Sequence, residues 1–147
     1  MFRRILVSTD GSPRSSRAIK SAAALARISG ASLTIFHAIP AYRTPYYAEG
    51  MGFAWPSETL YLKGLGRDAA RILARARALA TKQGIASTTV HAQGEDIALA
   101  IVAAAGKARA DLIVMASHGR KGLGKLLLGS ETQKVLARTR IPVLVVR

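Results

Sequence analysis

A glycine-rich segment late in the chain carries the residues best suited to bind an anion. Four glycines separate a strongly apolar segment from the start of a helical one: Gly119, Gly122, Gly124 and Gly129. Glycine lets main-chain N–H groups approach phosphate oxygens, and Ser130 with the free N–H groups of the following helix would complete an anion site. Arg120, Lys121 and Lys125 add positive charge. The alternative is that Ser130 and Gln133 only form a capping box and the glycines only turn the chain.

Two better-known nucleotide motifs nearly match this sequence, and both fail for physical reasons. Residues 119–125 follow a P-loop pattern, but Leu126 stands where a Ser or Thr hydroxyl should hold Mg²⁺, and no acidic strand is evident to complete the metal site. Residues 64–69 resemble a dinucleotide-binding fingerprint, but they lie inside a helical pattern with no strand before them. We therefore interpret the second segment as a helix irregularity.

Few other side chains are candidates for chemistry. Asp10 follows the first apolar run, where its carboxylate can accept hydrogen bonds from amine or hydroxyl groups or serve only as a turn residue before Gly11. The histidines His37, His91 and His118 lie far apart without the spacing of a metal site. We expect the first two to be structural, whereas His118 adjoins the glycine-rich loop and could donate to a phosphate or structure the loop. The absence of cysteine excludes thiolate metal sites and thiol nucleophiles.

Strands and helices alternate along the chain. The apolar patterns, caps and glycines predict strands at residues 5–7, 33–39, 87–91, 112–115 and 143–146, and helices at 13–29, 60–83, 97–107 and 130–138. Residues 40–59 are predicted to form a long loop. Such alternation indicates an α/β fold, with a parallel sheet, right-handed crossovers and helices on both faces. Ligands of these sheets bind outside the carboxyl ends of the strands, so the loops after the first and fourth strands are the expected site.

Size and charge limit the class of protein. The 147 residues are 50% hydrophobic, which suits a single domain spanning 1–147. No stretch reaches the roughly 18 apolar residues of a membrane helix, so we expect a cytoplasmic protein without membrane contact. The net charge of +14 predicts attraction to polyanions, and Arg67, Arg71 and Arg75 share one helical face. That face is either solvated or binds nucleic acid, and the scarcity of aromatic residues, at 5%, favours the first.

Several blocks of the sequence, in order, resemble the universal stress protein family over essentially the whole chain. The family's late phosphate motif is glycine, two residues, glycine, nine residues, then glycine with serine or threonine. Gly119, Gly129 and Ser130 fit this motif, whereas Ala116 replaces the first glycine. The other matching blocks are residues 5–12, 33–39, 111–115 and 141–146. The resemblance implies a Rossmann-like fold of the adenine nucleotide alpha hydrolase type, with strand order 3-2-1-4-5.

The resemblance also implies a site and a function. It places the nucleoside on Asp10, the base against Ala38 and Met115, and the ribose and phosphates on residues of the glycine-rich loop. The full set of expected cofactor-binding residues is Thr9, Asp10, Ala38, Met115, Ala116, His118, Gly119, Arg120, Gly129, Ser130 and Glu131. The expected ligand is ATP, or ADP or AMP, with Mg²⁺. Because a carboxylate at Glu131 would repel a triphosphate, diphosphate or weak ATP binding is one outcome.

The implied role is that of a stress-associated sensor or regulator with at most slow ATP hydrolysis; we assign no catalytic or metal-ligating residue. The resemblance further implies a homodimer formed through the last strand, Val143 to Val146, whose apolar edge would favour aggregation if left bare. Two alternatives stay open from the residues alone. One is a basic nucleic-acid-associated protein with no nucleotide site, and the other is an ATP-consuming enzyme.

Overall fold

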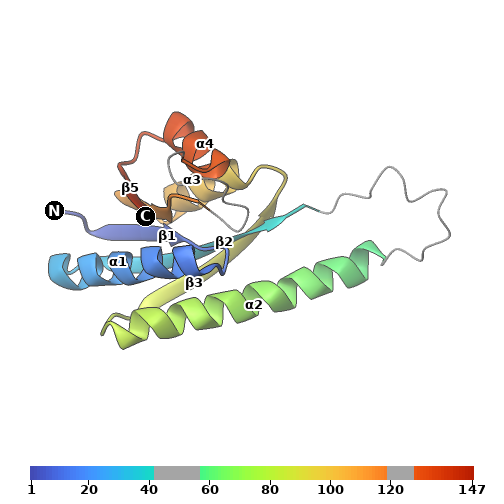
Figure 1. The fold of residues 1–147 in the computed structure, drawn as a ribbon, viewed down its shortest axis with the longest axis horizontal. Helices are drawn as coiled ribbons and strands as arrows, with labels where there is room; N and C mark the ends of the chain where they lie inside the picture. The colour runs from blue at the N-terminus through green and yellow to red at the C-terminus, as the bar shows by residue number, and fades with distance from the viewer. Residues whose placement is uncertain (42–56, 119–127) are drawn as a thin grey trace.

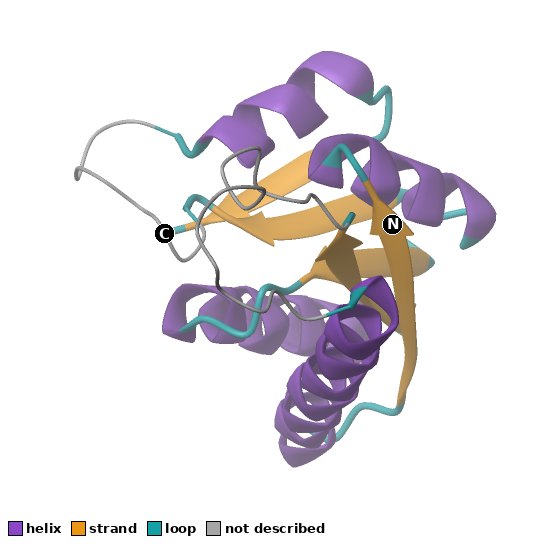
Figure 2. Ribbon diagram, turned by 90° about the vertical axis from the view of Figure 1, so that its right-hand side faces the viewer, coloured by secondary structure: helices purple, strands orange, loops and turns teal. Residues whose placement is uncertain are grey.

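The computed structural model describes residues 1–41, 57–118 and 128–147. In chain order the elements are β1 (Arg4–Ser8), α1 (Pro13–Ser29), β2 (Ser32–Pro40), α2 (Glu58–Lys82), β3 (Ser87–Gly94), α3 (Ile97–Lys107), β4 (Leu112–Ala116), α4 (Ser130–Arg138) and β5 (Val143–Val146). The strands form one parallel sheet in the order β3-β2-β1-β4-β5 (Figures 1 and 2). This confirms the predicted α/β fold and strand order.

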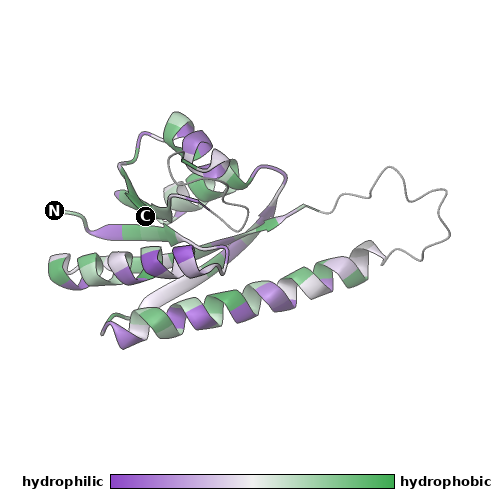
Figure 3. Ribbon diagram, in the orientation of Figure 1, coloured by the Kyte–Doolittle hydropathy of each residue, from purple (hydrophilic) through white to green (hydrophobic). Residues whose placement is uncertain are grey.

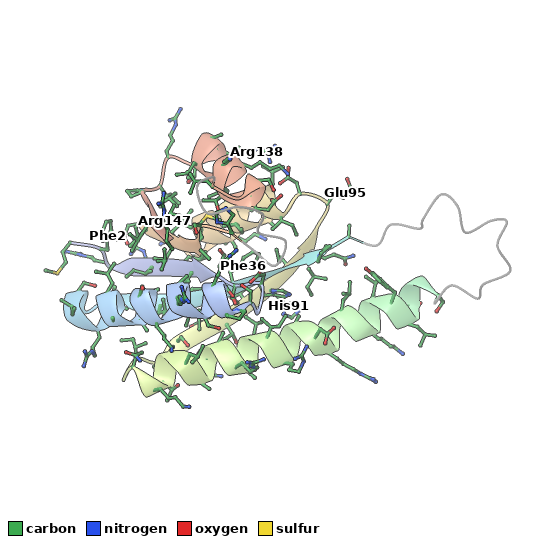
Figure 4. All side chains as sticks on the ribbon, in the orientation of Figure 1. Phe2, Phe36, His91, Glu95, Arg138 and Arg147 are labelled. Atoms are coloured by element: carbon green, nitrogen blue, oxygen red, sulfur yellow. The ribbon has the colours of Figure 1, made fainter. Side chains whose placement is uncertain are left out.

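The sheet is covered on both faces, so its central strands are apolar on both sides. Side chains alternate across β1, and Ile5 and Val7 pack in the cluster with α1 and α2, whereas Leu6 packs in the cluster with α3 and α4. Phe36 of β2 is fully buried in this second cluster (Figure 4). Hydrophobic and hydrophilic bands alternate along α1 and α2, as expected of helices with one face on a core (Figure 3).

The edge strand β3 is longer than the sequence predicts. We expected residues 87–91, but the ladder with β2 continues to the pair Pro40 and Gly94. The segment is short of strongly apolar residues because β3 is the sheet's outer strand and has several exposed positions. Its length therefore comes from main-chain pairing rather than from side-chain burial.

Local cap chemistry sets the ends of the long helices. Ser12 accepts a hydrogen bond from the N–H of Ser15 to start α1, and Gly30 ends it in the left-handed conformation at φ 68°, as predicted. Ser57 caps α2, which starts at Glu58 rather than at the predicted residue 60.

The predicted loop at residues 40–59 falls mostly on residues 42–56, which lie outside the described residues. No helix in the described parts of the chain is long and apolar enough to cross a membrane.

Asp111 ties the start of β1 to the start of β4. Its two carboxylate oxygens accept hydrogen bonds from the N–H groups of Arg3 and Arg4, each at 2.9 Å, and its own N–H donates to the carbonyl of Arg4 at 2.9 Å. Partial burial alone would raise the pKa of Asp111, but the hydrogen bonds from Arg4 and Arg3 outweigh it and hold the pKa below its ordinary value of 3.8.

Replacing Asp111 with alanine is expected to lower the free energy of unfolding at neutral pH by about 1–2 kcal/mol, because two N–H groups lose a charged acceptor. The native pKa is the lower one, so this stabilisation is present above the unfolded-state pKa and disappears as the pH falls through the native pKa. Urea unfolding at pH 7 and below pH 4 should show the two proteins converging in acid. Glu95→Ala, at an exposed carboxylate, is the control, and an unchanged gap in acid would contradict the prediction.

Candidate functional site

The site begins where the direction of winding reverses in the sheet. β1 pairs with β2 on one side and with β4 on the other, so the carboxyl ends of β1 and β4 lie next to each other. The β1–α1 loop, the residues after β4 and the start of α4 meet at this edge (Figure 1). Such a point is where ligands of open parallel sheets bind.

The β1–α1 loop is held by its own side chains. Thr9 is buried, and its hydroxyl lies 3.0 Å from the Ser15 hydroxyl and accepts a hydrogen bond from the N–H of Gly11 at 3.1 Å. Gly11 has a φ of 79°, which disfavours other residues there. The Asp10 carboxylate accepts a hydrogen bond from the N–H of Ser12 at 2.9 Å. Thr9 therefore shapes the loop, and Asp10 has the turn role that we considered as an alternative.

His37 fixes the same loop from the neighbouring strand. Its Nδ1 lies 2.7 Å from the Thr9 carbonyl oxygen, so this nitrogen carries the proton and donates. The N–H of Thr9 in turn donates to the Phe36 carbonyl at 2.9 Å. His37 is thus a structural residue of the site, and its contact spans 28 positions in sequence. His91 is exposed on the neighbouring strand β3, where it is the register partner of His37.

The start of α4 is bound directly to the end of β4. The N–H of Gly129 donates to the Ser117 carbonyl at 2.7 Å, and the buried Thr132 hydroxyl donates to the Ala116 carbonyl at 3.1 Å. A Cβ at position 129 would lie 3.1 Å from the Ser117 oxygen and 3.3 Å from the His118 Cα. Glycine is needed at position 129 because two backbone segments meet there. Its φ of −61° is one that other residues also adopt, so the requirement comes from the close contact and not from the backbone conformation. The N–H of Gly129 is used within the protein, so it is not among the donors that this turn leaves for an anion.

The first turn of α4 has main-chain donors that are not hydrogen-bonded to any residue the structure describes. Gly129 is the N-cap, with no side-chain hydrogen bond to the helix, and Ser130 is the first helical residue. Gln133 does not close a capping box, because its Nε2 donates to the Leu128 carbonyl at 2.7 Å. Among the described residues, no acceptor is hydrogen-bonded to the N–H groups of Ser130, Glu131 and Thr132. These N–H groups and the helix dipole together favour an anion.

Two buried polar atoms near this turn also have no hydrogen-bond partner in the part of the chain that the structure describes. His118 Nδ1 lies 3.2 Å from the Ser117 hydroxyl, whereas its Nε2 is buried without a hydrogen bond to any described residue. Glu131 Oε1 accepts from Lys134 Nζ at 3.0 Å, and its Oε2 is likewise buried and unpartnered within the described parts of the chain. Buried polar atoms are nearly always hydrogen-bonded in folded proteins.

The expected base-pocket residues lie on one face of the sheet. Ala38 of β2 and Met115 of β4 belong to the cluster on the α3 and α4 side, where Met115 is buried and Ala38 partly so. Ala116 ends β4 and packs toward the opposite cluster. Two expected residues, Gly119 and Arg120, lie outside the described residues. Within the described residues, no three His, Asp or Glu side chains are grouped to hold a metal ion.

Sequence analysis did not identify Ser117 and Thr132 as residues that shape this site. It also did not predict that His37 holds the β1–α1 loop. Their contacts join segments that are distant in the chain, so no local pattern reveals them. Thr132 carried a weak signal, because a threonine in the first turn of a helix that follows a glycine is suited to bond nearby carbonyls.

The fold defines a Rossmann-like α/β protein in which the start of α4 lies at the carboxyl edge of the sheet. The profile of the universal stress protein family matches residues 1–147, and the chain belongs to that family. A universal stress protein from Thermus aquaticus, encoded beside a QAH/OAS sulfhydrylase, is 36% identical over 157 residues, with 100% of each chain covered.

Solved structures of universal stress proteins are also similar to this chain. The chain is similar to a family member from Burkholderia pseudomallei, with a TM-score of 0.74 and 28% identity over 97% of this chain and 94% of that one. It is also similar to a universal stress protein in complex with cAMP, with a TM-score of 0.68 and 27% identity over 99% and 97% of the two chains.

Proposed function

We propose that this protein is a cytoplasmic stress-response regulator that binds an adenine nucleotide at the junction of β1, β4 and α4. The observation that carries the proposal is the start of α4, where three main-chain N–H groups and the buried Nε2 of His118 have no partner among the described residues. The cAMP complex of a similar protein supports an adenine ligand. The comparisons do not favour the alternative of a nucleic-acid-associated protein without a nucleotide site.

The described residues fit such a ligand in their chemistry. Phosphate oxygens would accept hydrogen bonds from the N–H groups of residues 130–132 and from His118. Asp10 would accept from the ribose or the base, and its anchoring by Ser12 fixes the carboxylate at the correct edge of the sheet. Ala38 and Met115 would supply the apolar wall of the base pocket. The predicted roles of Gly119 and Arg120 belong to the same proposal.

We propose ATP, ADP or AMP as the physiological ligand, with Mg²⁺ carried on the phosphates. Mg²⁺ keeps several waters and often takes only one or two carboxylates from a protein, so a nucleotide can bring it without a dedicated cage. Slow ATP hydrolysis is the only reaction that we include. A regulatory role suits a site that binds a nucleotide and holds it on main-chain donors.

Calorimetry with ATP, ADP, AMP and cAMP, each with and without Mg²⁺, tests this proposal. We expect saturable binding with a stoichiometry of one per chain and a nucleotide that co-purifies with the untagged protein, identified by mass spectrometry. Product analysis after long incubation measures hydrolysis. Absence of binding for all four nucleotides would contradict the proposal.

A homodimer through β5 is the second part of the proposal. β5 is an edge strand with one side unpaired, and Leu144 is 40% exposed on it. An apolar edge strand of this kind can pair with the same strand of a second chain. Leu144→Lys is expected to shift the protein from dimer to monomer in sedimentation velocity, with nucleotide affinity retained. A wild-type protein that sediments as a monomer at all concentrations would contradict this part alone.

A further inference from the structure

The excess positive charge is concentrated on one layer of the molecule. α1 and α2 contain ten Lys and Arg residues and two acidic ones, whereas α3 and α4 contain three basic residues and one acidic residue. α1 and α2 lie side by side over the same face of the sheet (Figure 1). This face therefore accounts for most of the net charge of +14.

A groove between α1 and α2 gathers these charges. Its volume is about 330 Å³, and it is lined by four basic residues: Lys20, Arg71, Arg75 and Lys82. A second groove of about 840 Å³ lies between α2 and β3, where Arg77, Lys82 and His91 contribute to the lining. Lys82 lines both grooves, so α2 presents basic side chains on each side. We call α1, α2 and their two grooves the basic face.

Within the described residues, this charge is hardly neutralised. Arg71 pairs with Asp68 at 3.2 Å, but their side chains are 62% and 61% exposed, and an exposed pair of this kind contributes less than about 1 kcal/mol. Lys20, Arg75 and Lys82 make no ion pair with any described residue. The basic face is therefore available to an external anion.

Three apolar residues of the groove are almost fully buried. Ile19, Ile72 and Ala76 line it but are 1%, 5% and 2% exposed, so they offer little surface to an amphipathic peptide or a lipid chain. The exposed apolar residues Ile28 and Leu60 lie near opposite ends of the face. Among the described residues, His91 is the one aromatic side chain in the lining of the two grooves, so unpaired nucleobases find almost no surface for stacking there.

We propose that the basic face binds the phosphodiester backbone of double-stranded nucleic acid through charge alone, without reading bases. A duplex presents closely spaced phosphates, and basic residues that neutralise them release counterions. The basic side chains are spread over two adjacent helices and two grooves, which matches a ligand whose negative charges cover a broad surface. The groove between α1 and α2 reaches Thr9 and Gly11 of the β1–α1 loop, so one end of the basic face adjoins the proposed nucleotide site. The basic residues lie on α1 and α2 and not on α4, and this inference does not depend on the nucleotide proposal.

The test is fluorescence anisotropy of a labelled DNA duplex titrated at several salt concentrations. We expect weak binding whose affinity falls steeply with salt. The variant Lys20→Gln/Arg71→Gln/Arg75→Gln should reduce the slope of log affinity against log salt by about 2 to 3, since each lost phosphate contact removes about 0.9. The matched control Arg3→Gln/Lys107→Gln/Arg140→Gln removes the same charge at exposed positions outside both grooves and should change the slope by less than about 1.

The outcomes separate this inference from its competitors. Equal losses in both triple variants would overturn it, because binding would then follow net charge rather than the basic face. Absence of duplex binding at low salt, tighter binding to single strands, or tighter binding to vesicles of phosphatidylserine would also overturn it. Calorimetry with ATP on the first triple variant distinguishes the two proposals, since retained nucleotide affinity with lost duplex binding supports two separate sites. Circular dichroism confirms that each variant is folded.

Discussion

Replacing Gly129 with valine is expected to lower the affinity for adenine nucleotides at least about 100-fold, which corresponds to about 2.7 kcal/mol. The added side chain begins 3.1 Å from the Ser117 carbonyl oxygen and 3.3 Å from the His118 Cα, and both of these are backbone atoms. The start of α4 must then move away from β4. Such a shift lengthens the hydrogen bond between the Gly129 N–H and the Ser117 carbonyl and displaces the N–H groups that would hold phosphate.

Calorimetry measures this effect, and a graded series makes it specific. Gly129→Ala adds only the Cβ and should cost less than valine. Gly106→Ala is the matched control, because a Cβ at that exposed helical position meets nothing within 4 Å. It should leave nucleotide affinity unchanged. If Gly129→Val binds nucleotides like the wild type while remaining folded, then the start of α4 is not the phosphate site.

Most of the fold follows from local patterns. The strands β1 and β4 are short apolar runs, and Ser12, Pro13 and Gly30 mark the ends of α1, so element order and parallel pairing could be predicted. The end of β3 could not be predicted in this way. Its last residues pair with β2 through main-chain groups, and pairing partners are not encoded in the composition of an edge strand.

The site residues likewise differ in whether a local sequence pattern could locate them. Asp10 and the helix start at Ser130 could be located because each follows a recognisable strand or precedes a recognisable helix. The close approach of Gly129 to the backbone of Ser117 and His118 could not be predicted, because the sequence shows a glycine but does not show which backbone approaches it. Thr132 bonds to a carbonyl 16 positions away, a contact that exists only after the sheet has formed.

The charge pattern was predicted only in part. The spacing of Arg67, Arg71 and Arg75 indicated one shared helical face, and Arg71 and Arg75 do line one groove. The contribution of Lys20 from α1 depends on the packing of the two helices, which a spacing rule within one helix does not address. A basic surface built from two elements therefore emerges only in the folded chain.

Glu131 is expected to determine how many phosphates the site accepts. Its carboxylate lies in the first turn of α4, with one oxygen on Lys134 at 3.0 Å and the other buried without a partner among the described residues. A carboxylate suits the helix dipole, but it competes with a phosphate for the same positive potential. Each further phosphate brings more negative charge toward it, so the repulsion is larger for ATP than for AMP.

Glu131→Gln is therefore expected to raise the affinity for ATP about fivefold and that for AMP less than about twofold, since one screened charge pair is worth about 1 kcal/mol. Lys134→Gln should act in the opposite direction, because it removes the cation that offsets the carboxylate. Calorimetry with AMP, ADP and ATP on the two variants gives the selectivity directly, and Glu95→Gln controls for net charge at an exposed position. An equal change for all three nucleotides in Glu131→Gln would mean that the carboxylate acts on the fold of the turn, since only a charge that faces the phosphates can discriminate by their number.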